Sequence, residues 1–307
     1  MSDPQDKPRH RPEPAPGVVP DDAGRVPAPA PPSTPDDAGP HASATPRPRA
    51  AQRAPLDIAP LLAGWEYEPG TINVRKVPGL DGREKLQMRL DLGLLQMELV
   101  GRPDGRTPHG CESLLEHHER QLAARGAGPA AEPFALGPTA CRLLREEAVL
   151  YYRRYVSLFV LGDYAGVVRD TARNLRLLDF CAAHAAEDHD RLILEQYRPY
   201  ILMMNTRAAA LLDSAAGRHE QALTTVMAGL ERIRQFFADF GQDDAYASSD
   251  EVRILKRLAR EVRRKLPVDP MARLRKDLAR AVAREDYERA ARLRDQISAR
   301  SDERPRA

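Results

Sequence analysis

Residues 138–164 read PTACRLLREEAVLYYRRYVSLFVLGDY, and residues 199–219 read PYILMMNTRAAALLDSAAGRH. In both stretches apolar residues recur at helical spacing, and the pattern stops at a glycine, Gly162 or Gly217. Glycine readily adopts the left-handed conformation that ends a helix, and a further helical pattern follows each of the two. The sequence therefore predicts two pairs of helices, over residues 138–160 and 164–184 and over residues 199–214 and 219–240.

The two pairs align on their turns, because Gly162-Asp163-Tyr164 matches Gly217-Arg218-His219. Each pair has a helix, a turn that contains a glycine and an aromatic ring, and a second helix with a small residue beyond the turn. This arrangement resembles a tetratricopeptide unit. The aligned spacing is 55 residues, whereas the repeat of that family has about 34. With another helix expected over 113–124, we predict a mainly α fold with a tetratricopeptide-like helical domain over 111–266. A generic helical bundle is the alternative.

Residues 56–110 carry the alternating pattern of β-strands. Residues 71–77 predict a short strand, which is followed by a turn rich in glycine and proline. Residues 86–92 then alternate between apolar and polar, and residues 95–99 resume the alternation on a shifted phase after Gly93. Since a glycine inside a strand suggests a bulge or bend, we predict a β-hairpin module whose second strand is long and bent.

The beginning of the chain has a different composition. Residues 1–55 contain 15 of the 27 prolines and no Phe, Trp or Tyr, and Pro-Asp-Asp-Ala-Gly occurs twice, at 20–24 and 35–39. Such a segment buries too little apolar surface to offset the entropy lost on ordering. We predict a disordered Pro/Ala-rich arm over residues 1–55, and a short tail over residues 302–307.

The apolar, cysteine and charge content of the chain limits the classes of protein to which it can belong. The sequence has no run of about 18 apolar residues and no apolar segment near Met1, so we expect no membrane span and no signal peptide. The three cysteines are widely spaced and odd in number, which fits reduced thiols in a cytoplasm. Residues 251–307 hold 18 Lys/Arg against 10 Asp/Glu, a net charge of +8 in a chain of net charge +2. We expect this basic end to be a solvated helical surface, with binding of phosphates or of an acidic partner as the alternative.

Residues 267–301 predict a helical hairpin. The apolar stripe of its first helix is Met271, Leu274, Leu278, Ala281 and Val282, and that of its second helix is Tyr287, Ala290, Ala291, Leu293 and Ile297. Residues 284–286 form the turn, where Asp286 is suited to cap the second helix, and the paired alanines suit close helix approach. A hairpin of this size buries too little apolar surface to be stable alone. We therefore expect it to dock on its own helical domain, on a second copy or on a partner.

The same hairpin resembles a known motif. The residues that carry the resemblance are Leu274, Leu278, Asp286-Tyr287-Glu288, Ala290-Ala291, Leu293-Arg294-Asp295 and Ile297. They closely resemble the UVR motif of bacterial excinuclease B and C subunits, which also occurs in Clp-type ATPases and in activators of protein-arginine kinases. The resemblance implies binding to another protein, often through another UVR hairpin, as an antiparallel coiled-coil pair. It makes the following residues the candidate partner-binding set: Leu274, Leu278, Tyr287, Ala290, Ala291, Arg294, Asp295 and Ile297.

A second, weaker resemblance lies upstream, where residues 74–105 look like the N-terminal block of bacterial proteins that end in a UVR motif. This resemblance implies no activity. The chain lacks a Gly-x-x-x-x-Gly-Lys-Ser/Thr phosphate loop, and it also lacks a Cys-x-x-Cys pair. It therefore lacks the signatures of the excinuclease B helicase core and of the zinc modules of kinase activators.

Clusters of titratable residues offer weak candidates for chemistry. Two groups combine residue types that bind metals, and they are His109, Cys111, His117 and His118, and His184, Asp188 and His189. Adjacent histidines point about 100° apart on a helix and the second group suits a solvated helix end, so we predict no metal site. We expect Glu146 and Glu147 to be surface charges rather than an acid/base pair, and residues 101–105 to be a structural turn rather than a phosphate site. Residues 151–155 mix Tyr and Arg, and we expect them to divide between the core and a solvated face.

These observations favour a non-enzymatic bacterial cytoplasmic adaptor or scaffold, with no catalytic residues, cofactor, metal or small-molecule substrate. Its expected partner is a protein, either another UVR-containing protein or a second copy, in nucleotide excision repair or in Clp-type protease or kinase regulation. The alternative is a nucleic-acid-binding accessory protein that uses the basic C-terminal region. A hydrolase centred on residues 101–118 is the least favoured interpretation.

Limited proteolysis tests the predicted arm. Because residues 1–55 carry many prolines and no aromatic side chain, a protease should trim the chain to a stable core that begins near Leu56. Mass spectrometry of the fragments is the measurement. Protection of residues 20–40 in the isolated protein would contradict the prediction.

Overall fold

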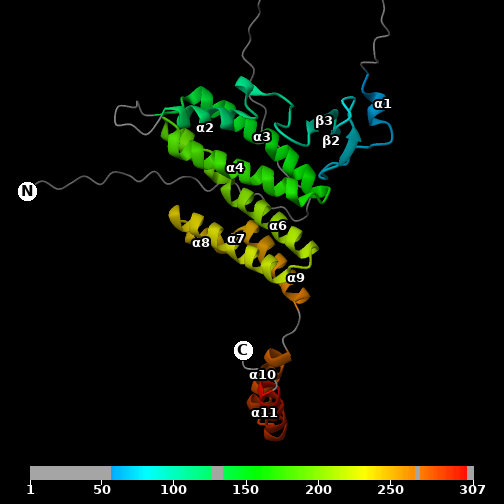
Figure 1. Cartoon of the computed structure of the whole chain (residues 1–307), viewed down its shortest axis with the longest axis vertical. Coiled ribbons are helices and arrows are strands. Elements are labelled where there is room, and N and C mark those ends of the chain that lie inside the picture. The colour runs from blue at the N-terminus through cyan, green and yellow to red at the C-terminus, as the bar shows by residue number, and fades with distance from the viewer. Residues whose placement is uncertain (1–56, 126–133, 267–269, 303–307) are drawn as a thin grey trace, which may run out of the picture.

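The computed structural model describes residues 57–125, 134–266 and 270–302. In these residues a small antiparallel sheet precedes a stack of α-helices, and a helical hairpin follows it (Figure 1). The predicted fold class, mainly α with a preceding β module and a C-terminal helical hairpin, is confirmed. The predicted arm over 1–55 and all but the first residue of the predicted tail lie outside the described residues.

The β module has three strands, not two. They are β1 (Val74–Pro78), β2 (Glu84–Leu90) and β3 (Gly93–Glu98), paired antiparallel in the order β1-β2-β3. The predicted long, bent second strand is wrong, because the chain reverses between Leu90 and Gly93, which face each other in the register. The shift in the alternating pattern at Gly93 therefore marks a tight turn and not a bulge.

Arg89 explains how this turn forms. Its Nη1 donates hydrogen bonds to the carbonyl oxygens of Leu90, Asp91 and Gly93, and its Nε donates to the carbonyl oxygen of Trp65 at 3.0 Å. Neither central residue of the turn has a positive φ, so the usual Asn-Gly signature of a two-residue hairpin is absent. A side chain that satisfies the turn carbonyls replaces that backbone signal.

The helices lie close to where the sequence places them. Before the C-terminal hairpin they are α1 (Ala59–Leu62), α2 (Leu114–Ala124), α3 (Pro138–Val160), α4 (Tyr164–His184), α5 (Asp188–Leu192), α6 (Arg198–Ala215), α7 (His219–Asp239), α8 (Asp243–Ser248) and α9 (Asp250–Lys265). Short 3-10 turns cover Pro108–Gly110 and Glu195–Tyr197. The predicted helices over 113–124, 138–160, 164–184, 199–214 and 219–240 are confirmed to within one residue at each end.

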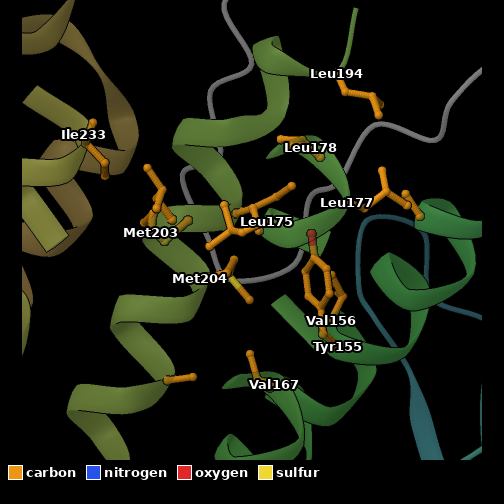
Figure 2. Close-up of a cluster of buried hydrophobic side chains, with 14 of the residues drawn as sticks. Tyr155, Val156, Val167, Leu175, Leu177, Leu178, Leu194, Met203, Met204 and Ile233 are labelled. Atoms are coloured by element: carbon orange, nitrogen blue, oxygen red, sulfur yellow. The ribbon is translucent and has the colours of Figure 1, made fainter. Parts of the chain in front are cut away.

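The helices stack in chain order. α3 packs on α4, α4 on α6, α6 on α7, and α9 on both α6 and α7. Figure 2 shows the buried cluster between them, with side chains that include Tyr155, Val156, Val167, Leu175, Leu177, Leu178, Met203, Met204 and Ile233. At Gly229 of α7 a methyl group would overlap the Thr206 side chain, so the glycine lets α7 approach α6 closely. The tetratricopeptide-like character of this stack stays a prediction.

The turn between α6 and α7 provides a test of the backbone argument. Gly217 has φ +76°, and a Cβ placed there would meet no atom within 4 Å, so the cost of a side chain is backbone strain alone. Gly217→Val should therefore lower the free energy of unfolding by about 1–3 kcal/mol. Thermal melting is the measurement, with Ala216→Val as the control, because Ala216 has φ −85° and is exposed. An unchanged melting temperature for Gly217→Val would show that the cap is not strained.

Candidate functional site: the C-terminal helical hairpin

The hairpin consists of α10 (Pro270–Ala283) and α11 (Tyr287–Asp302). The Asp286 carboxylate accepts a hydrogen bond from the backbone N–H of Arg289 at 3.1 Å, and so caps α11. Glu285 takes a left-handed conformation with φ +58°, and the backbone N–H of Asp286 donates to the carbonyl oxygen of Ala281 at 2.9 Å. The predicted turn at 284–286 and its cap are confirmed.

Fewer residues lie in the contact between the two helices of the hairpin than the predicted apolar stripes contain. Ala281 and Ala290 are buried where α10 and α11 meet, with 4% and 8% of their surface exposed. The half-buried residues beside them are Leu274, Leu278, Leu293 and Ile297. The prediction that both paired alanines lie in the helix contact is wrong, because Ala291 is exposed. Successive residues of a helix are 100° apart, so only Ala290 faces α10.

Two larger apolar residues also lie outside the contact. Val282 exposes 53% of its surface and Tyr287 exposes 70%, although both belong to the predicted apolar stripes. Along α11, Tyr287, Ala291, Arg294 and Asp295 follow the spacing i, i+4, i+7 and i+8, which places them on one side of the helix. All four are exposed, and Arg294 pairs with Asp295 at 3.2 Å. This outer stripe, Tyr287-Ala291-Arg294-Asp295, combines an aromatic ring, a small residue and a charged pair.

The candidate set therefore divides in two. Leu274, Leu278, Ala290 and Ile297 hold the two helices together, whereas the outer stripe is free to meet another surface. Within the described residues, α10 and α11 pack on each other and on no other element to a comparable extent. Figure 1 shows the hairpin apart from the helical stack, beyond the end of α9. Of the three docking surfaces expected from the sequence, the chain's own helical domain does not cover the hairpin.

A buried ion pair that the sequence analysis missed joins α3 to α4. Arg154 and Asp170 each expose 1% of their surface, and the guanidinium binds both carboxylate oxygens, at 2.7 and 2.8 Å. Arg154 Nη1 also donates to the carbonyl oxygens of Glu98 and Gly101, at 3.0 and 2.7 Å. Residues 151–155 were expected to divide between the core and a solvated face, and Arg154 is one of those that lie in the core. Residues 101–105 form a turn, and Arg154 binds its first carbonyl oxygen, that of Gly101.

Glu147 is the second charge that sequence reasoning misplaced. It was expected at the surface, but it exposes 1% of its surface and accepts hydrogen bonds from the backbone N–H groups of Leu114 and Leu115, at 2.8 and 3.3 Å. Its carboxylate also pairs with Arg173 and lies 3.2 Å from Arg102 Nε. Burial lowers the pKa of the Arg173 guanidinium, and the nearby Glu147 carboxylate opposes this shift. Glu147 thus anchors the N-terminus of α2.

A signal for these buried charges exists in the sequence. Leu144, Glu147, Tyr151 and Arg154 follow helical spacing, so the two charged residues share a face of α3 with a core leucine. The Tyr151 ring contacts two guanidinium groups, with that of Arg173 4.1 Å and that of Arg154 5.0 Å from its centre. Charges at core positions of an amphipathic helix indicate paired charges, because an unpaired one is too costly to bury.

The histidine clusters form no metal centre in the part of the chain that the structure describes. The rings of His109 and His117 stack with centres 4.1 Å apart, and burial lowers the pKa of His117, as do the neighbouring histidines. Cys111 is buried nearby. Across residues 57–125, 134–266 and 270–302, no group of three or more His, Cys, Asp or Glu side chains is arranged to hold a metal ion.

Comparison with known proteins assigns the hairpin. Residues 270–300 match the UVR family, described as the UvrB/uvrC motif, so the chain carries a UVR motif at its C-terminal end. In excinuclease subunits this motif is a module that contacts protein or DNA. No curated protein and no solved structure matches the chain. None of the helices in the described residues combines the length and apolar character needed to cross a membrane.

The two alanines of α11 provide a matched test of the hairpin geometry. Ala290→Glu should force a carboxylate into the contact with α10, where an unpaired charge costs several kcal/mol, and so unfold the hairpin. Ala291→Glu should leave the hairpin folded, because Ala291 faces solvent. Hydrogen exchange over residues 270–302, read by mass spectrometry, is the measurement. Equal protection in the two variants would show that the inner face is misassigned.

Proposed function

We propose that this protein is a non-enzymatic adaptor that binds a protein partner through its UVR hairpin. The observation that carries the proposal is the outer stripe of α11, Tyr287-Ala291-Arg294-Asp295, which is exposed on a folded hairpin that the helical stack does not cover. An exposed aromatic ring beside a small residue is typical of the centre of a protein interface, where aromatic anchors contribute most of the binding energy.

The favoured partner is another UVR-type hairpin, in a second copy of this chain or in a different protein. The support is the UVR match at residues 270–300 together with the antiparallel pairing that the motif's resemblance implies. Each hairpin alone is too small to bury its apolar residues fully, so pairing of two hairpins buries apolar surface of both. In this proposal the adaptor acts in excision repair or in the control of a Clp-type protease or kinase, while the stacked helices serve as a tetratricopeptide-like scaffold.

The polar clusters of the helical stack support a structural role over a catalytic one. The groups that acid/base chemistry would use, such as Glu147, are engaged in capping helices and in holding other charges. A cytoplasmic location is part of the proposal, and Cys111, Cys141 and Cys181 support it because all three are free thiols buried in the fold.

Partner capture tests the role of the outer stripe. Full-length protein carrying Ala291→Glu should bind its partner, or itself, at least about a hundredfold more weakly, since burying an unpaired charge costs several kcal/mol. Affinity capture and sedimentation are the measurements, with hydrogen exchange showing that the hairpin stays folded. Ala183→Glu, the same change at an exposed position of α4, is the control and should bind like the wild type.

Two outcomes would contradict the proposal. If Ala291→Glu binds normally with an intact hairpin, the partner surface lies elsewhere, on the helical stack or on the β module. If Ala291→Glu unfolds the whole protein, the hairpin packs on its own helical stack and is not an interaction module.

A further inference from the structure

α9 has two contrasting faces. The inner face packs on α6 and α7 through Val252, Leu255, Leu258, Ala259 and Val262, each of which is buried. The outer face presents a row of exposed cations, which are Arg253, Lys256, Arg257, Arg260, Arg263, Arg264 and Lys265. Glu261 is the only fully exposed acidic residue of this helix, all of which the structure describes. The outer face therefore carries a strong local positive charge on a helix that is fixed in the fold.

Most of these cations lack a counter-charge. Arg253 pairs with Asp250, and Lys265 donates to the Ser214 hydroxyl at 3.3 Å. Arg257, Arg260, Arg263 and Arg264 form no ion pair within the described residues. Several exposed arginines on other helices are ion-paired, as in Arg120–Glu116 on α2, Arg142–Glu146 on α3 and Arg234–Glu231 on α7, whereas Arg232 of α7 and Arg289 of α11 form no ion pair within the described residues. The outer face of α9 is distinguished by four unpaired arginines on one side of a single helix.

The helix dipole accounts for only part of this charge. Cations in the last turn stabilise a helix C-terminus, which covers Arg263 and Arg264. Arg257 and Arg260 lie a turn or more before that end, where the effect has faded. Arg207 of α6 lies close enough to α9 to interact with both Glu261 and Arg257. Burial lowers the pKa of Arg207, and Arg257 adds to this lowering, whereas Tyr164, Tyr200 and Glu261 oppose it.

We propose that the outer face of α9 binds the phosphate backbone of a nucleic-acid duplex. The four unpaired arginines lie within about 120° of the helix circumference and span about 10 Å along its axis. A duplex presents one charge per about 1.7 Å of its axis, so about six phosphates lie within that length. The guanidinium group matches phosphate geometry with two parallel hydrogen bonds. This surface lies outside residues 270–300, so it acts independently of the UVR hairpin and of the proposed adaptor function.

Other polyanions fit this face less well. An interfacial helix binds a membrane by inserting its apolar face, and the apolar face of α9 is buried in the helical stack. Binding of single strands relies on aromatic rings that stack on the bases, and residues 250–265 contain no aromatic side chain. A rigid row of arginines suits the regular charge spacing of a duplex better than the irregular spacing of an acidic protein.

The test is the salt dependence of binding, measured by fluorescence anisotropy with full-length protein and a labelled 20-base-pair DNA duplex. Neutralising four phosphates gives a slope of about −3.6 in log K against log salt concentration, or about 150-fold weaker binding at 200 mM than at 50 mM. The triple variant Arg257→Gln, Arg260→Gln and Arg264→Gln should bind more weakly and bring the slope to about −0.9. The same three positions changed to Lys should keep most of the slope, because the charge remains.

Two further triple variants carry the same change in net charge. One places Arg→Gln at Arg120, Arg142 and Arg234, which are exposed and ion-paired, and the other at Arg275, Arg289 and Arg292 of the hairpin. Both should bind the duplex with the wild-type slope. A duplex RNA and a single strand of the same length serve as the other probes, and the single strand should bind more weakly.

Several results would overturn the proposal. These are an unchanged slope in the α9 variant, a reduced slope in the hairpin variant alone, or tighter binding of the single strand. Displacement of the duplex by polyglutamate at equal charge concentration would overturn it as well, since it would point to an acidic protein partner. Thermal melting of the α9 variant should be unchanged, because the three side chains are exposed.

Discussion

The ion pair between Arg154 and Asp170 fixes the position of the sheet as well as that of two long helices. Removing two charges from water costs several kcal/mol per ion unless every donor and acceptor is satisfied. Here both groups are, since Arg154 binds both oxygens of Asp170 and the carbonyl groups of Glu98 and Gly101. Arg169 donates one hydrogen bond to the Asp170 carboxylate and another to the carbonyl oxygen of Leu99, so the end of β3 is held by α3 and α4 together. Removal of either partner would leave an unpaired charge in the core.

Glu147 performs the corresponding task for α2, which precedes the long helices in the chain. It binds the first N–H groups of that helix and the guanidinium of Arg173, so a carboxylate on α3 links α2 to α4. The buried charges Glu147, Arg154, Asp170 and Arg173 of α3 and α4 are therefore used within the fold. In contrast, the arginines of α9 and the outer stripe of α11 face solvent with few or no partners. Both surfaces proposed for binding lie in the last sixty residues, and residues 251–307 carry a net charge of +8.

Some features of the UVR hairpin can be predicted from the sequence, whereas others depend on packing. Its turn, its Asp286 cap and its two helices follow from local rules of helix capping and spacing, and the structure confirms them. The division between inner and outer residues does not follow from apolarity alone. Ala290 and Ala291 are chemically identical, and only the packing of α11 against α10 decides which one is buried.

Local signals in the sequence determined most of the helices and their ends, because apolar spacing and the glycines at 162 and 217 act within a few residues. They also determined the alternating pattern of the β module. They did not reveal the reversal at Asp91, because neither central residue of the turn has a positive φ and the Arg89 side chain binds the turn carbonyl groups instead. Nor did they place Glu147 and Arg154 in the core, because the partners of a buried charge lie 16 to 56 residues away and meet it only when the helices pack. The cost of burying a charge depends on those distant partners, so the tertiary structure alone decides it.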